Sequence, residues 1–235
     1  MSDADRIFLE TTRRFAPPRL ARDDVRIALE LSHASPEKAV ADLGCGYGRH
    51  LEVLAERGYA QALGIDRSRL LLEEARARAP HARLLRANLR SLPLQAGVLR
   101  AAFCFYSSMF LGSHDDARQA LSEAARVLCP GGSLVLTQDN PLRLALRPSA
   151  SFAEDVPGLG RVVEESRFEG SVDRVTKRLE AAGKPVLSAT FVIRYYLPSE
   201  LAALALSAGL VLKRLEPDAA LTEETPQLIA LLEKQ

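Results

Sequence analysis

Up to about residue 140, short apolar runs alternate with longer segments that have helical periodicity. The apolar runs predict buried strands at 38–43, 60–66, 82–86, 101–106 and 133–137. The segments between the runs predict helices at 49–57, 68–78 and 113–129. Strands that alternate with helices of this length form a parallel sheet with helices on both faces. The carboxyl ends of these strands, where such folds bind ligands, then lie along one edge of the sheet.

The chain has a different pattern on both sides of this region. Amphipathic helices are predicted before it, at 3–15 and 20–31, and they form either a lid over the strand ends or a cover for one sheet face. After Pro148, polar and apolar residues alternate, and this predicts antiparallel strands at 161–168, 174–180 and 185–195. The last predicted elements are a helix and two strands, at 198–207, 210–215 and 227–233.

Composition and charge narrow the class of protein. Hydrophobic residues make up 47% of the chain and charged residues 26%, as in ordinary globular proteins. The net charge of +1 gives no electrostatic argument for binding nucleic acid or a membrane surface. The sequence has no apolar run of bilayer length and no signal peptide, so we expect a cytoplasmic protein.

A glycine-rich turn follows the first predicted strand and is the strongest functional signal. Gly44, Gly46 and Gly48 allow the backbone to approach a ligand closely, and the helix after them directs free N–H groups at it. The spacing is G-x-G-x-G, whereas a pyrophosphate-binding loop has G-x-G-x-x-G. Asp42, two residues before the turn, would repel a pyrophosphate but can pair with an ammonium group. A cationic nucleoside that carries an amino acid therefore fits this turn better than NAD.

Two further strand ends carry groups that suit a nucleoside. Asp66 ends the second predicted strand, 22 residues after Gly44, and its carboxylate can accept from both ribose hydroxyls. Asn88 follows the third predicted strand, and Tyr106 stands at the end of the fourth.

At this point the sequence resembles the class I S-adenosylmethionine-dependent methyltransferases. The resemblance rests on Val40-Ala41-Asp42-Leu43-Gly44-Cys45-Gly46-Tyr47-Gly48, Gly64-Ile65-Asp66, Ala87-Asn88-Leu89-Arg90-Ser91-Leu92-Pro93 and Ala124-Ala125-Arg126-Val127-Leu128-Cys129-Pro130-Gly131-Gly132. It implies a Rossmann-like, doubly wound α/β fold with a seven-stranded sheet whose last strand is antiparallel. It also implies a cofactor-binding core (38–140) in a single 235-residue methyltransferase domain, with an N-terminal helical lid (1–34). An antiparallel insert (160–196), similar to that of one small-molecule branch, would cover the substrate or form a dimer contact.

The resemblance also implies roles for individual residues. Gly44, Cys45, Gly46 and Gly48 would line the methionine and ribose portion of S-adenosylmethionine, with Asp42 near its ammonium group. Asp66 would hold the ribose hydroxyls, and Arg67 would flank the adenine. Asn88 stands where the family usually has an aspartate that accepts from the adenine amino group, and an amide oxygen can still accept that bond. Leu89 would donate its backbone N–H to the adenine, Tyr106 would lie beside the sulfonium, and no metal is implied.

The expected reaction is an in-line transfer of the methyl group to an O, N or C nucleophile of a small molecule, with S-adenosylhomocysteine as the product. Alignment of the nucleophile and exclusion of water are the main demands on the protein, so the fold prescribes no catalytic residue. The candidate bases or substrate contacts are His50, Tyr106, Asn140, Tyr195 and Tyr196. Each has a structural alternative: for example, His50 can point at solvent and the tyrosines can pack on the sheet.

Two rival interpretations remain. One is an RNA-directed or protein-directed methyltransferase, and the seven arginines and two glutamates of the segment 67–90 suggest a protein that binds or modifies nucleic acid. A solvated helix face explains the same charges, and no aromatic residue is present there to stack on a base. The other rival is a non-catalytic cofactor-binding protein whose insert pairs across a dimer axis. We therefore expect a small-molecule acceptor, no membrane or nucleic-acid partner, and a monomer or homodimer.

Overall fold

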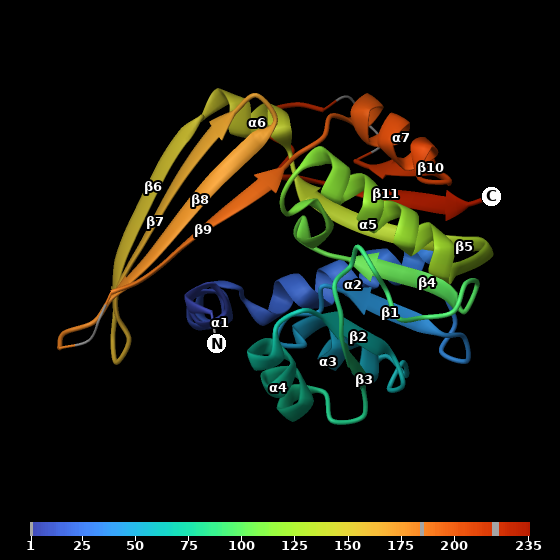
Figure 1. Cartoon of the computed structure of the whole chain (residues 1–235), viewed down its shortest axis with the longest axis horizontal. Helices are drawn as coiled ribbons and strands as arrows, with labels where there is room; N and C mark the ends of the chain where they lie inside the picture. Colours follow the sequence, from blue (N-terminus) through green and yellow to red (C-terminus); the bar gives the residue numbers. More distant parts are fainter. Residues whose placement is uncertain (1, 184–185, 218–220) are drawn as a thin grey trace.

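The computed structural model describes residues 2–183, 186–217 and 221–235, and it contains two separate sheets (Figure 1). The larger sheet has seven strands in the order β10-β11-β5-β4-β1-β2-β3. Their bounds are β1 Val40–Leu43, β2 Leu63–Asp66, β3 Arg83–Arg86, β4 Leu99–Cys104, β5 Leu128–Asp139, β10 Leu210–Glu216 and β11 Gln227–Lys234. β11 is antiparallel to both of its neighbours, β5 and β10, which confirms the predicted seven-stranded α/β architecture with an antiparallel last strand.

Helices cover both faces of this sheet (Figure 1). One face carries α2 (Pro18–Ser32), α3 (Arg49–Glu56) and α4 (Arg69–Arg78), and the other carries α5 (His114–Val127) and α7 (Pro198–Ser207). Local sequence explains where the helices begin. The Ser68 side chain accepts from the backbone N–H of Leu71 at the start of α4, and Ser113 and Asp116 form a capping box at the start of α5.

The start of β5 differs from the prediction. The helix was predicted to end at Pro130-Gly131-Gly132 and the strand to begin at Ser133, but the strand already begins at Leu128 and passes through all three residues. Gly131 has a φ of +68°, and the pairing of β4 with β5 shifts register between Leu99 and Ala101. The strand therefore contains an irregularity where the sequence pattern indicated a break.

The second sheet forms an arm that extends from the core (Figure 1). It consists of four antiparallel strands: β6 (Ser149–Val156), β7 (Gly160–Glu169), β8 (Val172–Glu180) and β9 (Leu187–Arg194). Only three were predicted, and one of those was placed from Pro185, which lies outside the described residues. The missed strand, β6, is exposed along almost its whole length and so lacks the alternation that marks a half-buried strand. The short helix α6 (Pro141–Leu146) was also missed.

The N-terminal helix α1 (Asp3–Phe15) packs against this arm. Its Ile7 is completely buried and forms an apolar cluster with Val162 of β7 and Leu179 of β8. As a result, α1 lies between the concave side of the arm and the carboxyl edge of the large sheet (Figure 1). Within the described ranges, every helix is too short or too polar to cross a lipid bilayer.

Candidate functional site

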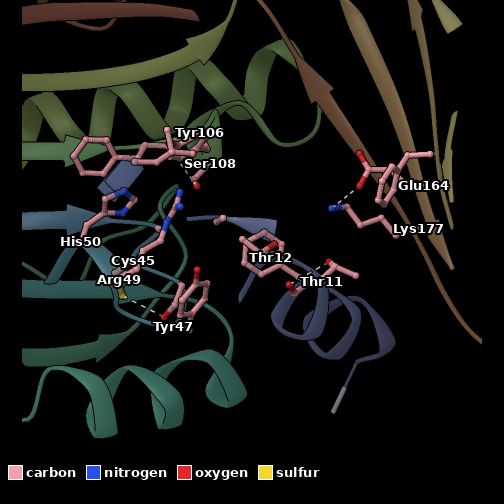
Figure 2. Close-up of a pocket in the computed structure, with 17 residues that line it drawn as sticks. Thr11, Thr12, Cys45, Tyr47, Arg49, His50, Tyr106, Ser108, Glu164 and Lys177 are labelled. Carbon is pink, nitrogen blue, oxygen red and sulfur yellow. Dashed lines mark hydrogen bonds and ion pairs between the residues drawn. The ribbon is translucent and has the colours of Figure 1, made fainter. Parts of the chain in front are cut away.

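A cavity of about 530 Å³ lies between the glycine-rich turn and the arm (Figure 2). The core contributes the turn, the start of α3 and the segment after β4, whereas α1, α2 and the arm form the opposite walls. Among the residues whose roles were predicted, those that line the cavity are Gly44, Cys45, Gly46, His50 and Tyr106. The structure thus brings part of the predicted site together in one concave space.

The glycine-rich turn has a backbone that other residues would strain. Gly44, Gly46 and Gly48 have φ values of +83°, +52° and +82°. The N–H groups of Gly44 and Cys45 both donate to the carbonyl oxygen of Ile65, at 2.7 and 3.0 Å, and this ties the turn to β2. A Cβ atom at Gly44 would lie only 2.6 Å from the Cβ of Ser108. Glycine is therefore required here both for the conformation and for the close approach of the next segment.

Asp66 joins this turn to the next strand end. Its Oδ2 accepts from the N–H of Gly46 at 3.0 Å, and its Oδ1 accepts from the N–H of Ser68 at 2.8 Å. Burial raises the pKa of Asp66 above its usual value, and the two backbone donors oppose that shift. Since each carboxylate oxygen has a second lone pair, Asp66 can still accept hydrogen bonds from a ligand.

Asp42 is the next-to-last residue of β1 and is almost completely buried, at 1% exposure. Its Oδ2 atom has no hydrogen-bond partner among the described residues. Burial, helped by the nearby negative charge of Asp66, raises the pKa of Asp42 to about 7 against the opposing effect of the positive charge of Arg49. An ionised carboxylate that is buried without a hydrogen-bond partner destabilises the folded protein unless a cation binds to it.

His50 and Tyr106 belong to a buried hydrogen-bond network around Asp24 of α2. The Oδ2 of Asp24 lies 3.1 Å from Nε2 of His50 and accepts from the Tyr106 hydroxyl at 2.8 Å. Because a carboxylate oxygen accepts, Nε2 of His50 carries the proton and Nδ1 has the lone pair. Burial lowers the pKa of His50 to about 4, so the imidazole is neutral at pH 7. His50 also stacks on Phe105 with ring centroids 4.1 Å apart, and therefore does not point at solvent.

Tyr106 is held in an uncommon backbone conformation. Tyr106 and Ser107 both have positive φ, +54° and +57°, a conformation that costs a non-glycine residue roughly 1–2 kcal/mol. Thr137 of β5 holds them there, because its Oγ1 accepts from the N–H of Tyr106 at 2.8 Å and its carbonyl accepts from the N–H of Ser107 at 2.9 Å. Such strain often accompanies a functional role, and here it turns the phenol toward the cavity (Figure 2).

The opposite wall is mainly apolar, and its polar groups are two threonines of α1, Thr11 and Thr12, and one ion pair. Nζ of Lys177 lies 2.8 Å from Oε2 of Glu164, and both side chains come from the arm (Figure 2). Phe8 and Leu20 from the N-terminal helices line the same part of the cavity. An acceptor held here would have mainly apolar surroundings, with one charged pair to orient it.

Three of the predicted catalytic candidates lie outside this cavity. Asn140 caps α6, and its side-chain nitrogen donates to the carbonyls of Thr222 and Thr225 at 2.8 and 3.0 Å. The Tyr195 hydroxyl donates to Asp139 at 3.4 Å. The Tyr196 hydroxyl lies 3.3 Å from Nδ1 of His114, at a different concave surface beside α5 and α7. These contacts give all three side chains structural roles.

The residues predicted to hold adenine lie at the neighbouring strand ends, outside the cavity itself. Arg67 and Asn88 are exposed, and Leu89 is half-buried. The Oδ1 of Asn88 already accepts from the N–H of Arg90 at 3.1 Å. The same oxygen also accepts from Nε of Arg90 at 3.3 Å, so an adenine amino group would have to displace one of these two donors.

Sequence reasoning missed several residues that line or shape the cavity. Asp24 is the most informative, because an acid stands on the apolar face of α2 beside Ala21, Val25 and Ala28. That position is a usable signal, since an acid on a buried face needs a partner. Arg49 was noted only as a helix start, and nothing in the pattern of the arm distinguished Lys177 from its other charged residues.

Comparison with known proteins relates part of this chain to methyltransferases. Residues 40–132 match the family model described as "Methyltransferase domain". Trans-aconitate 2-methyltransferase of Paracidovorax citrulli is 33% identical over 151 residues, which cover 62% of this chain and 55% of that protein. The chain spans about a third to just over half of the length of the curated relatives that it matches.

Solved structures extend the likeness over nearly the whole chain. The CcbJ methyltransferase from Streptomyces caelestis superposes with a TM-score of 0.78 at 21% identity, covering 94% of this chain and 97% of that one. CalS10 is an amino pentose methyltransferase from Micromonospora echinaspora whose structure contains S-adenosylmethionine. It superposes with a TM-score of 0.67 at 23% identity, covering 92% of both chains. At these identities the likeness shows a shared fold. The family match therefore relates residues 40–132 to a methyltransferase domain, and the solved structures show that the fold is shared over nearly the whole chain.

Proposed function

We propose that this protein transfers a methyl group from S-adenosylmethionine to an O, N or C nucleophile of a small molecule and releases S-adenosylhomocysteine. The observation that carries this proposal is the cavity of about 530 Å³, which has the glycine-rich turn on one side and the arm with α1 on the other. Its volume is that of a small-molecule site. The relatives that act on trans-aconitate and on an amino pentose are consistent with such an acceptor.

The residues around the turn fit S-adenosylmethionine. The buried Oδ2 of Asp42, without a hydrogen-bond partner among the described residues, suits the ammonium group of the methionine moiety. The glycine backbone leaves room for the cofactor to lie against the turn, and the free lone pairs of Asp66 suit the ribose hydroxyls. When bound, the cofactor supplies a methyl group that its sulfonium charge has already activated.

The side chains of the protein orient the acceptor and limit which nucleophiles can react. His50 is a weak base because burial lowers its pKa to about 4, and Tyr106 stays protonated because burial and the nearby Asp24 raise its pKa. Neither group readily removes a proton at neutral pH. We therefore favour an acceptor that reacts without first losing a proton, such as a carboxylate or an unprotonated amine, with His50 and Tyr106 in positioning roles.

Binding of the reaction product tests the proposal without knowledge of the acceptor. Titration calorimetry with S-adenosylhomocysteine is expected to show one-to-one binding to the wild-type protein. Asp66→Ala is expected to weaken that binding by about 10- to 100-fold, as for the loss of a charged hydrogen-bond partner. Undetectable binding to the folded wild-type protein would overturn the proposal.

A second measurement addresses the acceptor. The protein is incubated with S-adenosylmethionine carrying a labelled methyl group and with separate pools of small carboxylic acids and small amines. Label is expected to appear in one of these pools. Transfer to RNA or to protein instead, at equal concentrations, would favour the rival interpretation.

A further inference from the structure

A second cavity, of about 540 Å³, lies where the end of β9 reaches the core beside α5 and α7 (Figure 1). The arm contributes Arg194, the last residue of β9, and Ser171 of the turn between β7 and β8. The core contributes the first turns of α5 and one side of α7. The described residues that line this cavity are all different from those that line the cavity beside the glycine-rich turn. Its volume is that of a separate small-molecule site.

Arg194 carries a positive charge that the protein leaves without a counter-ion. Its Nη1 donates to Oγ of Ser171 at 3.1 Å, and its buried Nε has no hydrogen-bond partner among the described residues. Within the described ranges, no carboxylate oxygen lies within 4.0 Å of the guanidinium nitrogens. A single neutral hydroxyl satisfies one of five guanidinium donors and compensates none of the charge. A partly buried guanidinium with these contacts favours the binding of an anion.

A second arginine adds to the positive charge of this cavity. Arg118 lies one turn after His114 on the same face of α5, and both side chains line the cavity. Nε of Arg118 is 3.6 Å from Oδ1 of Asp115, but these two side chains are 51% and 85% exposed. An ion pair between side chains so exposed is weak, so Arg118 remains available to a ligand.

The rest of the lining is consistent with an anionic organic molecule. Glu200 is the one acidic side chain among the described residues of the lining, and its Oε2 already accepts from the N–H of Leu197 at 2.8 Å. The two arginines therefore outnumber the acid, with His114 left out of the count. Ala203 and Leu204 of α7 supply an apolar part of the wall. The cavity thus combines an excess of positive charge with space for a short apolar group.

We propose that this second cavity binds the phosphate or carboxylate group of a small organic molecule, with Arg194 as the main donor and Arg118 as the second. A guanidinium suits either group, because its planar donors can pair with two oxygen atoms at once. Binding there would add a link between the end of β9 and the start of α5. Just before these two points, the N–H of Gly112 already donates to the carbonyl of Val192 at 3.0 Å. The site is separate from the proposed methyl transfer, so each is tested without the other.

The test uses three probes that share a short alkyl chain: butyl phosphate, pentanoate and uncharged butanol. Each is titrated into the full-length protein, and backbone amide NMR shifts give both the dissociation constant and the place of binding. The variants are Arg194→Gln and Arg118→Gln, checked for folding by circular dichroism. Arg174→Gln is the matched control, because Arg174 is an exposed arginine of β8 in the same arm and does not line the cavity.

At least one of the two anions is expected to bind saturably, with the largest shifts at 114–118, 171 and 194–207. The tighter of the two identifies the group as a phosphate or a carboxylate. Arg194→Gln is expected to weaken that binding by about 10- to 100-fold, as for the loss of a charge-assisted hydrogen-bond donor. Arg118→Gln is expected to weaken it by about 3- to 10-fold, because this side chain is more exposed. Arg174→Gln is expected to change it by less than about twofold.

Several results would overturn the proposal. One is the absence of saturable shifts with both anions, and another is equal affinity for butanol, which would show that the charge is not recognised. Shifts centred on 44–50 would place the probes in the first cavity, and shifts centred on 67–90 would show unspecific binding to the exposed arginines there. An affinity unchanged by both Arg194→Gln and Arg118→Gln would show that neither guanidinium binds the anion. Since Arg118 is exposed, its variant keeps the test decisive even if Arg194→Gln does not fold.

Discussion

Gly48→Ala is expected to lower the free energy of unfolding by about 2 to 5 kcal/mol. Gly48 has a φ of +82°, which alone strains an alanine by about 1–2 kcal/mol. In addition, its new Cβ would lie 2.9 Å from both Cα and Cβ of Ala75 in α4. The Cα is backbone and cannot rotate away, so α3 and α4 would have to separate. Chemical denaturation, read by circular dichroism, measures the loss.

Gly209→Ala is the matched control for this experiment. Gly209 has nearly the same φ, +85°, but a Cβ there would meet no atom within 4 Å. It therefore reports the cost of the backbone conformation alone, about 1–2 kcal/mol. If the free energy of unfolding falls equally in the two variants, the contact with Ala75 is not the reason that position 48 requires glycine.

Asp42→Asn is expected to stabilise the free protein at pH 8 and to impair cofactor binding. In the wild type, burial raises the pKa of Asp42 to about 7 from an unfolded value of 3.8. The folded state therefore holds this proton more tightly than the unfolded state, and the contribution of Asp42 to stability falls as pH rises from about 4 to 7. Asparagine does not titrate. The stability of the variant relative to the wild type should grow by about 2 to 3 kcal/mol between pH 5 and pH 8.

The same substitution should change the pH dependence of binding. Below pH 7, the wild-type Asp42 must release its proton before it can pair with the ammonium of S-adenosylhomocysteine. Its affinity should therefore rise by about tenfold per pH unit up to about pH 7 and then level off. The variant should bind about 10- to 100-fold more weakly at pH 8, without this dependence. A wild-type profile that is flat between about pH 5 and 8 would contradict either the raised pKa of Asp42 or its pairing with the ammonium group.

The parts of the site that were predictable from sequence are those set by strand ends. Asp42 is the next-to-last residue of β1 and Asp66 the last residue of β2, and parallel strands bring their carboxyl ends to one edge of the sheet. The glycine-rich turn was also predictable, because glycines stand at the positions where its backbone has positive φ. The roles of these residues toward a cofactor stay proposals that binding measurements will test.

The missed parts depend on tertiary packing that a single sequence does not specify. Tyr195 and Tyr196 were plausible cavity residues, but the packing of the arm turns them toward Asp139 and His114. Asp24 acquires its function only because α2 lies against the start of α3, where His50 needs a partner. Side-chain direction in these cases follows from how elements dock, which local periodicity does not determine.

The cluster of Ile7 with Val162 and Leu179 has a consequence for protein engineering. The two segments that form the wall of the cavity opposite the glycine-rich turn are far apart in sequence but share one apolar interface. A transplant of residues 149–194 from a relative would therefore leave Ile7 against a surface with which it did not evolve. A chimera designed to alter the choice of acceptor should therefore take both α1 and the four-stranded arm from the same parent protein.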